Sequence, residues 1–332
     1  MARRPHLTIA VLGDGGWGTT LAIHLHGLGH RVRWWGAFSR YAGLVERKRE
    51  NVKFLPGIRI PAGLHLSANL RQVVEPAGLI VLAIPSQHLR SVIRRLAGLP
   101  LRGTRFLNVA KGIETTTLKR MSEVVREELG RVPLAVLSGP NIASEIASRH
   151  PASSVVASHD RSLASDLQHA FTNEWLRLYT SSDVTGVELG GALKNPIAIA
   201  AGISDGLGFG ANAKAALITR GVVEMARLGV ALGAREQTFW GLSGLGDLVT
   251  TCLGGRNRWL GEQIGRGQSP SAVLAGTPMV IEGVDTTRAA VALGRRAGVE
   301  APIIEQVFRV LFRRTNPRTA LRALMVRARK PE

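Results

Sequence analysis

The sequence predicts an α/β fold of two domains, an N-terminal parallel-sheet domain over residues 1–180 and a mainly α-helical C-terminal domain over residues 181–332. Up to about Thr180, short apolar stretches alternate with helical patterns, as in a parallel sheet that helices cover on both faces. After Ser181 the strand patterns fade and helical patterns take over. A chain of 332 residues is long enough for two such domains.

The first element is a strand, Leu7–Leu12, which runs directly into Gly13-x-Gly15-x-x-Gly18 and then into a helical pattern from Thr19. A dinucleotide pyrophosphate needs a tight strand-to-helix turn, a bare backbone for close approach, and helix N-terminal amides directed at its charge. Gly13 suits the turn, Gly15 the close approach, and Gly18 the packing of helix on strand. The order of strand, glycine fingerprint and helix therefore predicts a Rossmann-type dinucleotide-binding domain.

The next elements extend this domain. A leucine stripe from Leu21 to Leu28 predicts the first helix, and Arg31–Trp35 predicts the second strand, which completes a βαβ unit. A further helix is expected over Leu118–Leu129. The remaining buried strands are expected at Leu79–Ile84, Arg105–Val109, Leu134–Ser138 and Ser154–Ala157. Ligands of such sheets bind beyond the carboxyl ends of the strands.

The C-terminal domain is predicted from segments with helical periodicity. These segments are Val187–Ala201, Asn212–Leu232, Arg235–Trp240, Arg288–Ala297 and Ile303–Leu311.

Composition limits the kind of protein. The net charge of +19 favours anionic ligands, but the arginines are scattered and aromatic residues make up only 5% of the chain. A solvated basic surface is therefore favoured over a specific nucleic-acid site. Apolar runs stay shorter than the roughly 18 residues of a membrane span. With one cysteine, Cys252, neither an internal disulfide nor a multi-cysteine metal site is expected, and a cytoplasmic location is predicted.

Several motifs together identify a resemblance. The motifs are GDGGWGTTLA (13–22), NVKFLPG (51–57), AKG (110–112), SGPNIASE (138–145), ELGGALKN (188–195), AGISDGLGFGANAKAALITRG (201–221), GLGDLVTTC (244–252), GGRNR (254–258) and VIEGVDTT (280–287). Of these motifs, the Lys-Asn segment of ELGGALKN and GGRNR are the most specific. The motifs occur in the order found in NAD(P)-dependent glycerol-3-phosphate dehydrogenase, and the chain resembles that family over nearly its whole length.

The resemblance implies an oxidoreductase that reduces dihydroxyacetone phosphate to sn-glycerol 3-phosphate, reversibly, with NADPH or NADH. The product would supply glycerophospholipid synthesis. No metal is implied. The oligomeric state stays open, with a homodimer as one possibility.

Ketone reduction builds negative charge on the carbonyl oxygen, so the enzyme needs a proton donor or a cation there. Lys194 resembles the family's catalytic lysine, the general acid and base, whereas a lone lysine would be an exposed helix residue. Lys111 resembles the family lysine that contacts substrate and cofactor, and a second ammonium nearby favours proton exchange by Lys194 near neutral pH. Asp247 resembles the family aspartate and would hold Lys194, or alternatively cap a helix.

Arg256 follows two glycines, which offers a guanidinium fork and free amides to a phosphate. The resemblance implies that this segment binds the substrate phosphate and touches the cofactor. The other substrate-binding residues that it implies are Gly139, Asn141, Asn195, Thr251 and Asn257. The other cofactor-binding residues that it implies are Gly16, Trp17, Ala143, Val280 and Glu282, beside the three fingerprint glycines and Lys111.

The choice of cofactor is predicted from an absence. An NAD site commonly places an acid about 20 residues past the fingerprint, but the second strand ends in Trp35-Gly36-Ala37. A 2′-phosphate would meet Arg40, or secondarily Arg33. NADPH is therefore expected to be used at least as well as NADH, although both arginines also fit a solvated loop.

Two alternatives remain open. An enzyme of the same architecture with another substrate, such as a 3-hydroxyacid dehydrogenase or a ketopantoate reductase, would explain the fingerprint but has no need of the phosphate-binding GGRNR turn. A basic nucleic-acid-binding protein would explain the charge but not the motifs.

Overall fold

The computed structural model describes residues 6–101, 103–326 and 328, and it divides into two compact units. The first unit comprises Met1–Ala110 and Met121–Val184, and the second comprises Lys111–Arg120 and Thr185–Glu332. The change of unit after Val184 lies close to the boundary expected at residue 181. The segment Lys111–Arg120, which was expected in the N-terminal domain, belongs to the second unit.

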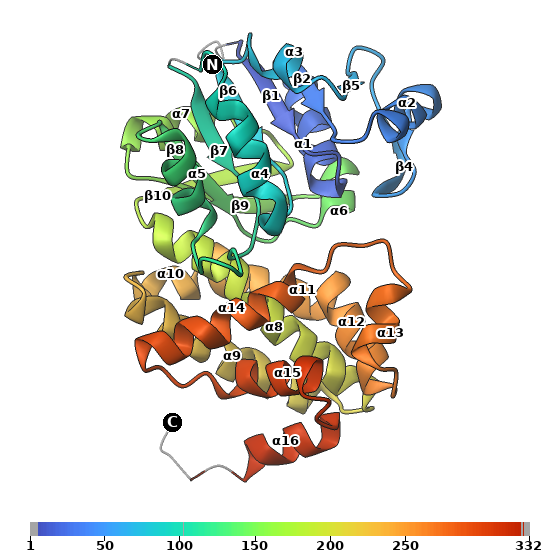
Figure 1. Cartoon of the computed structure of the whole chain (residues 1–332), viewed down its shortest axis with the longest axis vertical. Coiled ribbons are helices and arrows are strands. Elements are labelled where there is room, and N and C mark those ends of the chain that lie inside the picture. The colour runs from blue at the N-terminus through green and yellow to red at the C-terminus, as the bar shows by residue number, and fades with distance from the viewer. Residues whose placement is uncertain (1–5, 102, 327, 329–332) are drawn as a thin grey trace. The chain divides into compact units, whose positions relative to one another are not determined.

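Among the described residues, the first unit is built on an eight-stranded sheet with the order β10-β9-β8-β7-β6-β1-β2-β5 (Figure 1). Each strand predicted from the sequence is present. The predicted strands correspond to β1 (Thr8–Leu12), β2 (Arg31–Trp35), β6 (Leu79–Leu82), β7 (Arg105–Asn108), β8 (Leu134–Ser138) and β9 (Ala152–Ser158). The sheet also contains β5 (Leu66–Ser67) and β10 (Leu176–Ser181), which were not predicted. A separate hairpin pairs β3 (Glu50–Asn51) with β4 (Leu55–Arg59).

The sheet is parallel from β5 to β8, but β9 runs antiparallel to β8 and β10 runs parallel to β9. The fold class is confirmed, while the expectation of a wholly parallel sheet is wrong at this edge. The connection from β8 to β9 contains only α6 (Ala143–Ala147). A parallel return needs a crossover element that runs back along the sheet, and this connection lacks one.

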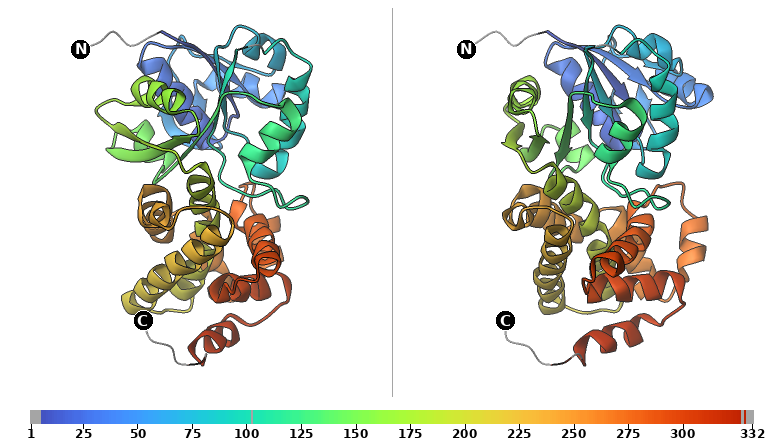
Figure 2. Two further views of the ribbon diagram at one scale, coloured as in Figure 1. Left: turned by 90° about the vertical axis from the view of Figure 1, so that its left-hand side faces the viewer. Right: turned by 60° about the vertical axis from the view of Figure 1, so that its left-hand side comes forward.

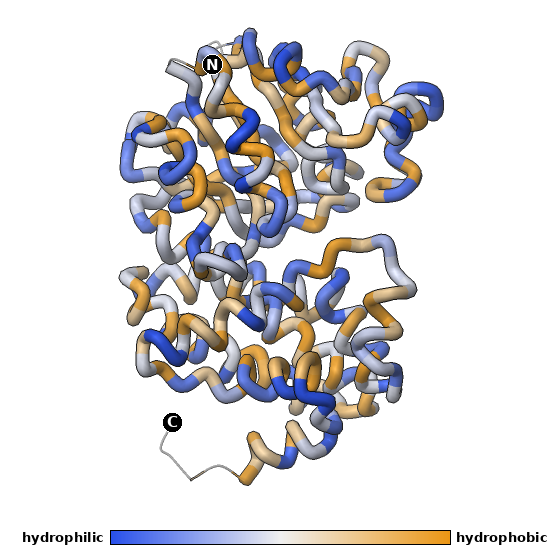
Figure 3. The backbone as a smooth tube through the Cα atoms, viewed as in Figure 1, coloured by the Kyte–Doolittle hydropathy of each residue, from blue (hydrophilic) through white to orange (hydrophobic). Residues whose placement is uncertain are grey.

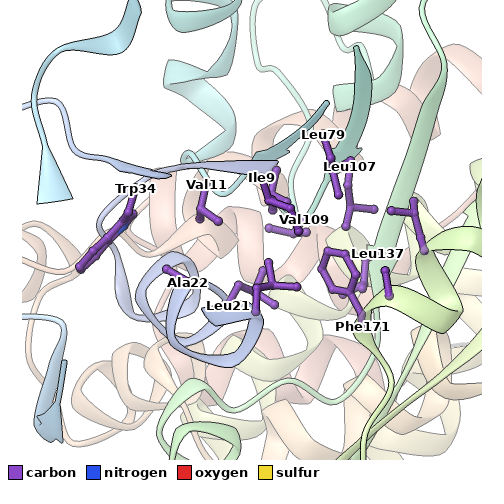
Figure 4. Close-up of a cluster of buried hydrophobic side chains, with 14 of the residues drawn as sticks. Ile9, Val11, Leu21, Ala22, Trp34, Leu79, Leu107, Val109, Leu137 and Phe171 are labelled. Atoms are coloured by element: carbon purple, nitrogen blue, oxygen red, sulfur yellow. The ribbon is translucent and has the colours of Figure 1, made fainter. Parts of the chain in front are cut away.

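Alternate residues of β1 face opposite sides of the sheet. Ile9 and Val11 pack against α1 (Gly16–Gly27) in one buried cluster, which also includes residues of α2 (Ser39–Lys48) and α7 (Arg161–Phe171) (Figure 4). Coloured by hydropathy, α2 stands out as the more hydrophilic of these helices (Figure 3). On the other face, Ala10 and Leu12 join a second cluster with α3 (Leu70–Val74), α4 (Ser86–Ala97) and α5 (Met121–Leu129). Helices therefore cover both faces, as predicted.

The second unit is helical, and its described residues contain no strand (Figure 2). All the predicted helices are present, although most of their ends differ by a few residues. They correspond to α8 (Val184–Gly206), α9 (Ala211–Ala231), α10 (Glu236–Trp240), α14 (Glu282–Ala297) and α15 (Pro302–Phe312). The helices α11 (Asp247–Leu253), α12 (Arg256–Gly265), α13 (Pro270–Ala275) and α16 (Pro317–Met325) were not predicted. A π-helical turn, Leu242–Gly246, precedes α11. No described helix is long and apolar enough to cross a membrane.

Small residues let α8 and α12 cross closely. A Cβ on Gly202 would overlap the carbonyl oxygen of Arg258, and a Cβ on Gly261 would overlap that of Ile199. Any larger side chain at either glycine would push the helices apart. This crossing brings the start of α12 beside the middle of α8.

Candidate active site

A buried carboxylate in the second unit binds two ammonium groups. Lys194 Nζ donates to one oxygen of Asp247, and Lys111 Nζ donates to the other at 2.6 Å. The exposed fractions of Lys194 and Asp247 are 6% and 1%. Lys194 Nζ also donates to Thr251 Oγ1 at 2.7 Å, and that hydroxyl donates in turn to the backbone carbonyl of Asp247. The site therefore places two cations around one buried anion.

The backbone of α8 allows this contact. A Cβ on Gly190 would lie 2.6 Å from the carbonyl oxygen of Ser243, so only glycine lets the π-helical turn approach α8 this closely. The turn leads directly into α11, whose first residue is Asp247. Asp247 therefore lies opposite Lys194, and its carboxylate binds the lysines rather than capping its own helix.

A second buried ion pair anchors the segment that carries Lys111. Arg120 donates to Glu188 at 2.9 Å, and Glu188 is only 9% exposed on α8. Ile113 is fully buried in the same hydrophobic cluster as Leu193. These contacts hold Lys111–Arg120 against α8 within the second unit. Sequence reasoning assigned no role to Arg120 or Glu188, although Glu188 belongs to the ELGGALKN motif.

Burial controls the acidity of Lys194. Desolvation lowers the pKa of Lys194 from its ordinary value of 10.5 to about 7, with the charge of Asp247 opposing and that of Lys111 adding to the decrease. An ammonium carries three N–H donors, and Asp247 and Thr251 take two of them. Lys194 can thus exchange a proton near neutral pH with an oxygen placed beside it.

Two asparagines continue the polar cluster. Asn257 Nδ2 donates to Asn195 Oδ1 at 2.9 Å, and Asn257 Oδ1 accepts from the backbone N–H of Gly283 at 3.0 Å. Asn195 Nδ2 lies 3.5 Å from the carbonyl oxygen of Lys111. These bonds join α8, α12 and α14, so Asn257 has a structural task that its motif did not reveal.

Arg256 lies exposed in the first turn of α12, after Gly255 with φ of 97°. The described residues give its guanidinium no hydrogen bond, although Glu282 at the start of α14 interacts with its charge. Val280, just before Glu282, is 41% exposed. The helix N-terminus and the guanidinium together provide what an anionic group binds.

The glycine fingerprint of the first unit fits a dinucleotide. Gly13 has φ of 126°, and its Cβ would overlap the carbonyl oxygen of Ala83. A Cβ on Gly15 would meet nothing within 4 Å, so this backbone has an open side. Helix α1 begins at Gly16 rather than at Thr19, and no side chain caps its N-terminal amides. The indole N–H of Trp17 is buried and has no partner among the described residues. The loop therefore fits a pyrophosphate.

Asn51 holds this loop, which sequence reasoning missed. Its side chain is fully buried, and its Nδ2 donates to the carbonyl oxygen of Asp14 and to Thr19 Oγ1, both at 2.7 Å. Its Oδ1 accepts from Tyr41 Oη at 2.6 Å. The NVKFLPG motif was the available signal. The contact was missed because this motif lies next to the fingerprint in space but not in sequence.

Other predicted residues of the first unit lie at two places. Ala143 is next to the fingerprint, because its carbonyl oxygen accepts from Thr20 at 2.9 Å and its Cβ faces Gly16. Gly139 has φ of 146° after β8, and the Asn141 amide bonds to the hydroxyl of Ser154.

The two arginines expected at the cofactor differ. Arg33 donates to the carbonyl oxygen of Gln72 at 3.1 Å, so α3 engages its guanidinium. Arg40 is exposed in the first turn of α2.

Within the second unit, the structure thus brings together Lys111, Lys194, Asn195, Asp247, Thr251 and Asn257. Cys252 is fully buried nearby, and burial raises the pKa of its thiol to about 12, which fits a packed side chain rather than a nucleophile. Among the described residues, no group of His, Cys, Asp and Glu has the arrangement of a metal site.

Both halves of the chain match known proteins. The model for the N-terminus of NAD-dependent glycerol-3-phosphate dehydrogenase matches residues 8–164, and the model for its C-terminus matches residues 183–322. Glycerol-3-phosphate dehydrogenase (NAD(P)+) of Syntrophotalea carbinolica is 49% identical over 334 residues, which cover 98% of this chain and 99% of that one. The protein of the same name from Chlorobium phaeobacteroides is 46% identical over 331 residues, which cover 98% of this chain and 99% of that one. The crystal structure of glycerol-3-phosphate dehydrogenase from Coxiella burnetii has a TM-score of 0.94 and 38% identity, and covers 97% of this chain and 99% of its own.

Proposed function

The chain belongs to the NAD-dependent glycerol-3-phosphate dehydrogenase family, and we propose that it reduces dihydroxyacetone phosphate to sn-glycerol 3-phosphate, reversibly, with NADH or NADPH. The observation that carries the mechanism is the buried contact of Lys194 with Asp247 beside Lys111. A lysine whose pKa is about 7 can both give and take a proton under physiological conditions.

Lys194 acts as the general acid of the reduction. The reduced nicotinamide, when bound, would supply the hydride that forms the new C–H bond at the carbonyl carbon. The Lys194 ammonium transfers its proton to the carbonyl oxygen, so the product is a neutral hydroxyl and Lys194 is left as an amine. In the reverse direction the Lys194 amine removes that proton from the substrate hydroxyl and becomes an ammonium again.

Asp247 and Thr251 position Lys194. The carboxylate holds the ammonium by a charge-assisted hydrogen bond, and the hydroxyl fixes a second N–H. Lys111, held by the other oxygen of Asp247, adds positive charge where the carbonyl oxygen becomes negative. The side chain of Asn195 lies next to these groups, and its amide donates a hydrogen bond to the bound substrate in this proposal.

The substrate phosphate binds Arg256 and the N-terminal amides of α12. The presence of this phosphate-binding group argues against a 3-hydroxyacid dehydrogenase or a ketopantoate reductase, since a carboxylate substrate has no need of a phosphate site. Gly139 and Asn141 contribute to substrate binding in the same proposal.

The cofactor binds the fingerprint, where Gly13, Gly15 and Gly18 shape the turn and the amides from Gly16 onward face the pyrophosphate. Trp17 and Ala143 line the same loop. Lys111, Arg256, Val280 and Glu282 complete the cofactor contacts in this proposal. The name of the curated relatives, glycerol-3-phosphate dehydrogenase (NAD(P)+), covers both NAD(H) and NADP(H).

The function is tested with a substrate panel followed by the absorbance of reduced nicotinamide. Oxidation of NADH or NADPH should require dihydroxyacetone phosphate, and unphosphorylated dihydroxyacetone should turn over poorly. Equal rates with ketopantoate, or none with dihydroxyacetone phosphate, would overturn the proposal. A cytoplasmic location, a supply of sn-glycerol 3-phosphate to phospholipid synthesis and a homodimeric assembly belong to the same proposal.

A further inference from the structure

Asp14, the variable residue between the first two fingerprint glycines, contacts the end of the second strand. A Cβ built on Gly36, directly after β2, would lie 2.6 Å from Asp14 Oδ2 and 2.9 Å from its Cγ. The carboxylate therefore fills the space that a side chain at Gly36 would take. The acid that is missing from the end of β2 is replaced in space by one from the glycine loop.

Neighbouring strands explain this proximity. β1 and β2 are parallel, with Leu12 beside Trp35, and the N–H of Gly13 donates to the carbonyl oxygen of Trp35 at 2.9 Å. The loops that follow the two strands consequently lie side by side at the carboxyl edge of the sheet. In dinucleotide-binding sheets of this type, the adenosine ribose lies at this edge, beyond the end of the second strand.

The Asp14 carboxylate has unused hydrogen-bonding capacity. Its Oδ2 is buried and has no hydrogen-bond partner among the described residues. Burial raises the pKa of this carboxyl, against the opposing charge of Lys53. A buried acceptor without a donor is costly, and two ribose hydroxyls are donors of the right kind.

We propose that Asp14 accepts hydrogen bonds from the adenosine ribose hydroxyls and is the residue that disfavours a 2′-phosphate. This inference rests on the proposed cofactor site but not on the identity of the substrate. The expected preference for NADPH depended on the absence of an acid near β2, and Asp14 removes that premise. NADH is then the better cofactor, and Arg40 is a solvated residue of α2.

The test compares the wild-type chain with Asp14→Asn, which keeps the shape and removes the charge. Binding of NADH and NADPH is measured by calorimetry, and kcat/KM is measured for both cofactors at one ionic strength. The affinity for NADPH relative to that for NADH, and the corresponding ratio of kcat/KM values, should each rise by about 10-fold or more. Glu174→Gln, which removes one exposed acid from the same unit, should leave the ratio unchanged.

A second variant moves the acid. In Asp14→Ala/Gly36→Asp, a Cβ at position 36 would have its closest remaining contact at 3.1 Å, with Cβ of residue 14. The moved carboxylate should restore the preference for NADH that Asp14→Ala alone loses.

The outcomes are distinguishable. An NADPH-to-NADH ratio that changes less than 2-fold in Asp14→Asn, while both cofactors still bind, would overturn the role of Asp14 alone. Failure of the wild-type chain to bind either cofactor would instead overturn the proposed function.

Discussion

Lys194 donates a hydrogen bond to Asp247 where both side chains are almost completely buried. The pair joins α8 to α11, and neither partner has access to bulk water that could replace the other. An uncompensated charge at this depth costs several kcal/mol, so each residue requires the other. The same contact raises the pKa of Lys194 against the larger lowering effect of burial, which connects the stability of this site to its chemistry.

The first prediction concerns pH. The pKa of Lys194 is lowered to about 7, so the ammonium needed for reduction is lost as the pH rises through this value. The kcat/KM for reducing dihydroxyacetone phosphate should therefore fall above about pH 7, and the kcat/KM for oxidising sn-glycerol 3-phosphate should rise over the same interval. Steady-state pH profiles in both directions check this. Two profiles that move together would contradict the assignment.

The second prediction concerns Asp247→Asn. Removing the carboxylate leaves two ammonium groups without their anion, which should lower the free energy of unfolding by about 3–5 kcal/mol. It also removes the charge that raises the pKa of Lys194, so the fall in reduction should move to lower pH. Urea denaturation and a pH profile measure the two effects. Asp166→Asn, which removes a 63% exposed acid paired with Arg105, is the matched control and should change stability by less than about 1 kcal/mol.

The third prediction concerns the substrate phosphate. Arg256→Ala should raise the KM for dihydroxyacetone phosphate by about 10-fold to 100-fold, as expected when a charge-assisted contact is lost, and should affect unphosphorylated dihydroxyacetone much less. Arg256→Lys should rescue only partly, because an ammonium cannot form the bidentate fork. Arg266→Ala, at the other end of α12, should leave the KM for each of the two substrates near its wild-type value. Equal losses with the two substrates would show that Arg256 serves the cofactor or the fold.

The fourth prediction concerns Asn51. Its side chain bonds the fingerprint loop at Asp14 and Thr19, so Asn51→Ala should loosen that loop and cost about 1–3 kcal/mol of stability. Cofactor binding should weaken while kcat at saturating cofactor stays within about 2-fold of wild type. Tyr41→Phe, which removes the bond to Asn51 Oδ1 and the acceptor of the Lys53 backbone N–H but leaves the bonds from Asn51 to the loop, should have a smaller effect in the same direction. If kcat falls and the cofactor Kd does not change, Asn51 does not act through the loop.

Local patterns predicted much of the fold. The ends of β2 and β8 agree with the predicted strands because apolar runs bounded by turn residues define them. Helix α1 begins three residues earlier than predicted because the fingerprint itself adopts helical geometry. The antiparallel β9 was not predictable from its own residues, since strand direction depends on the path of the connection.

The site was predictable as far as its motifs were. Lys194, Lys111 and Asp247, each chosen from a motif, lie in contact in the structure, although 136 residues separate the last two. Contacts that depend on tertiary packing were not predicted, such as Arg120 with Glu188 or Asp14 with Gly36. No periodicity encodes a contact between residues that are distant in sequence, and the closeness of α8 to α12 depends on which glycines face each other.

The central claim is that Lys194 gives and takes the proton, and Lys194→Met tests it most directly. Single-turnover reduction of dihydroxyacetone phosphate by the NADH-loaded variant should be slower than wild type by roughly 100-fold to 10,000-fold, the usual effect of losing an acid-base group. Calorimetry should find unchanged NADH binding, and Lys48→Met, an exposed lysine in α2, should react at the wild-type rate. A Lys194→Met variant that retains more than about a third of the wild-type rate would contradict the account.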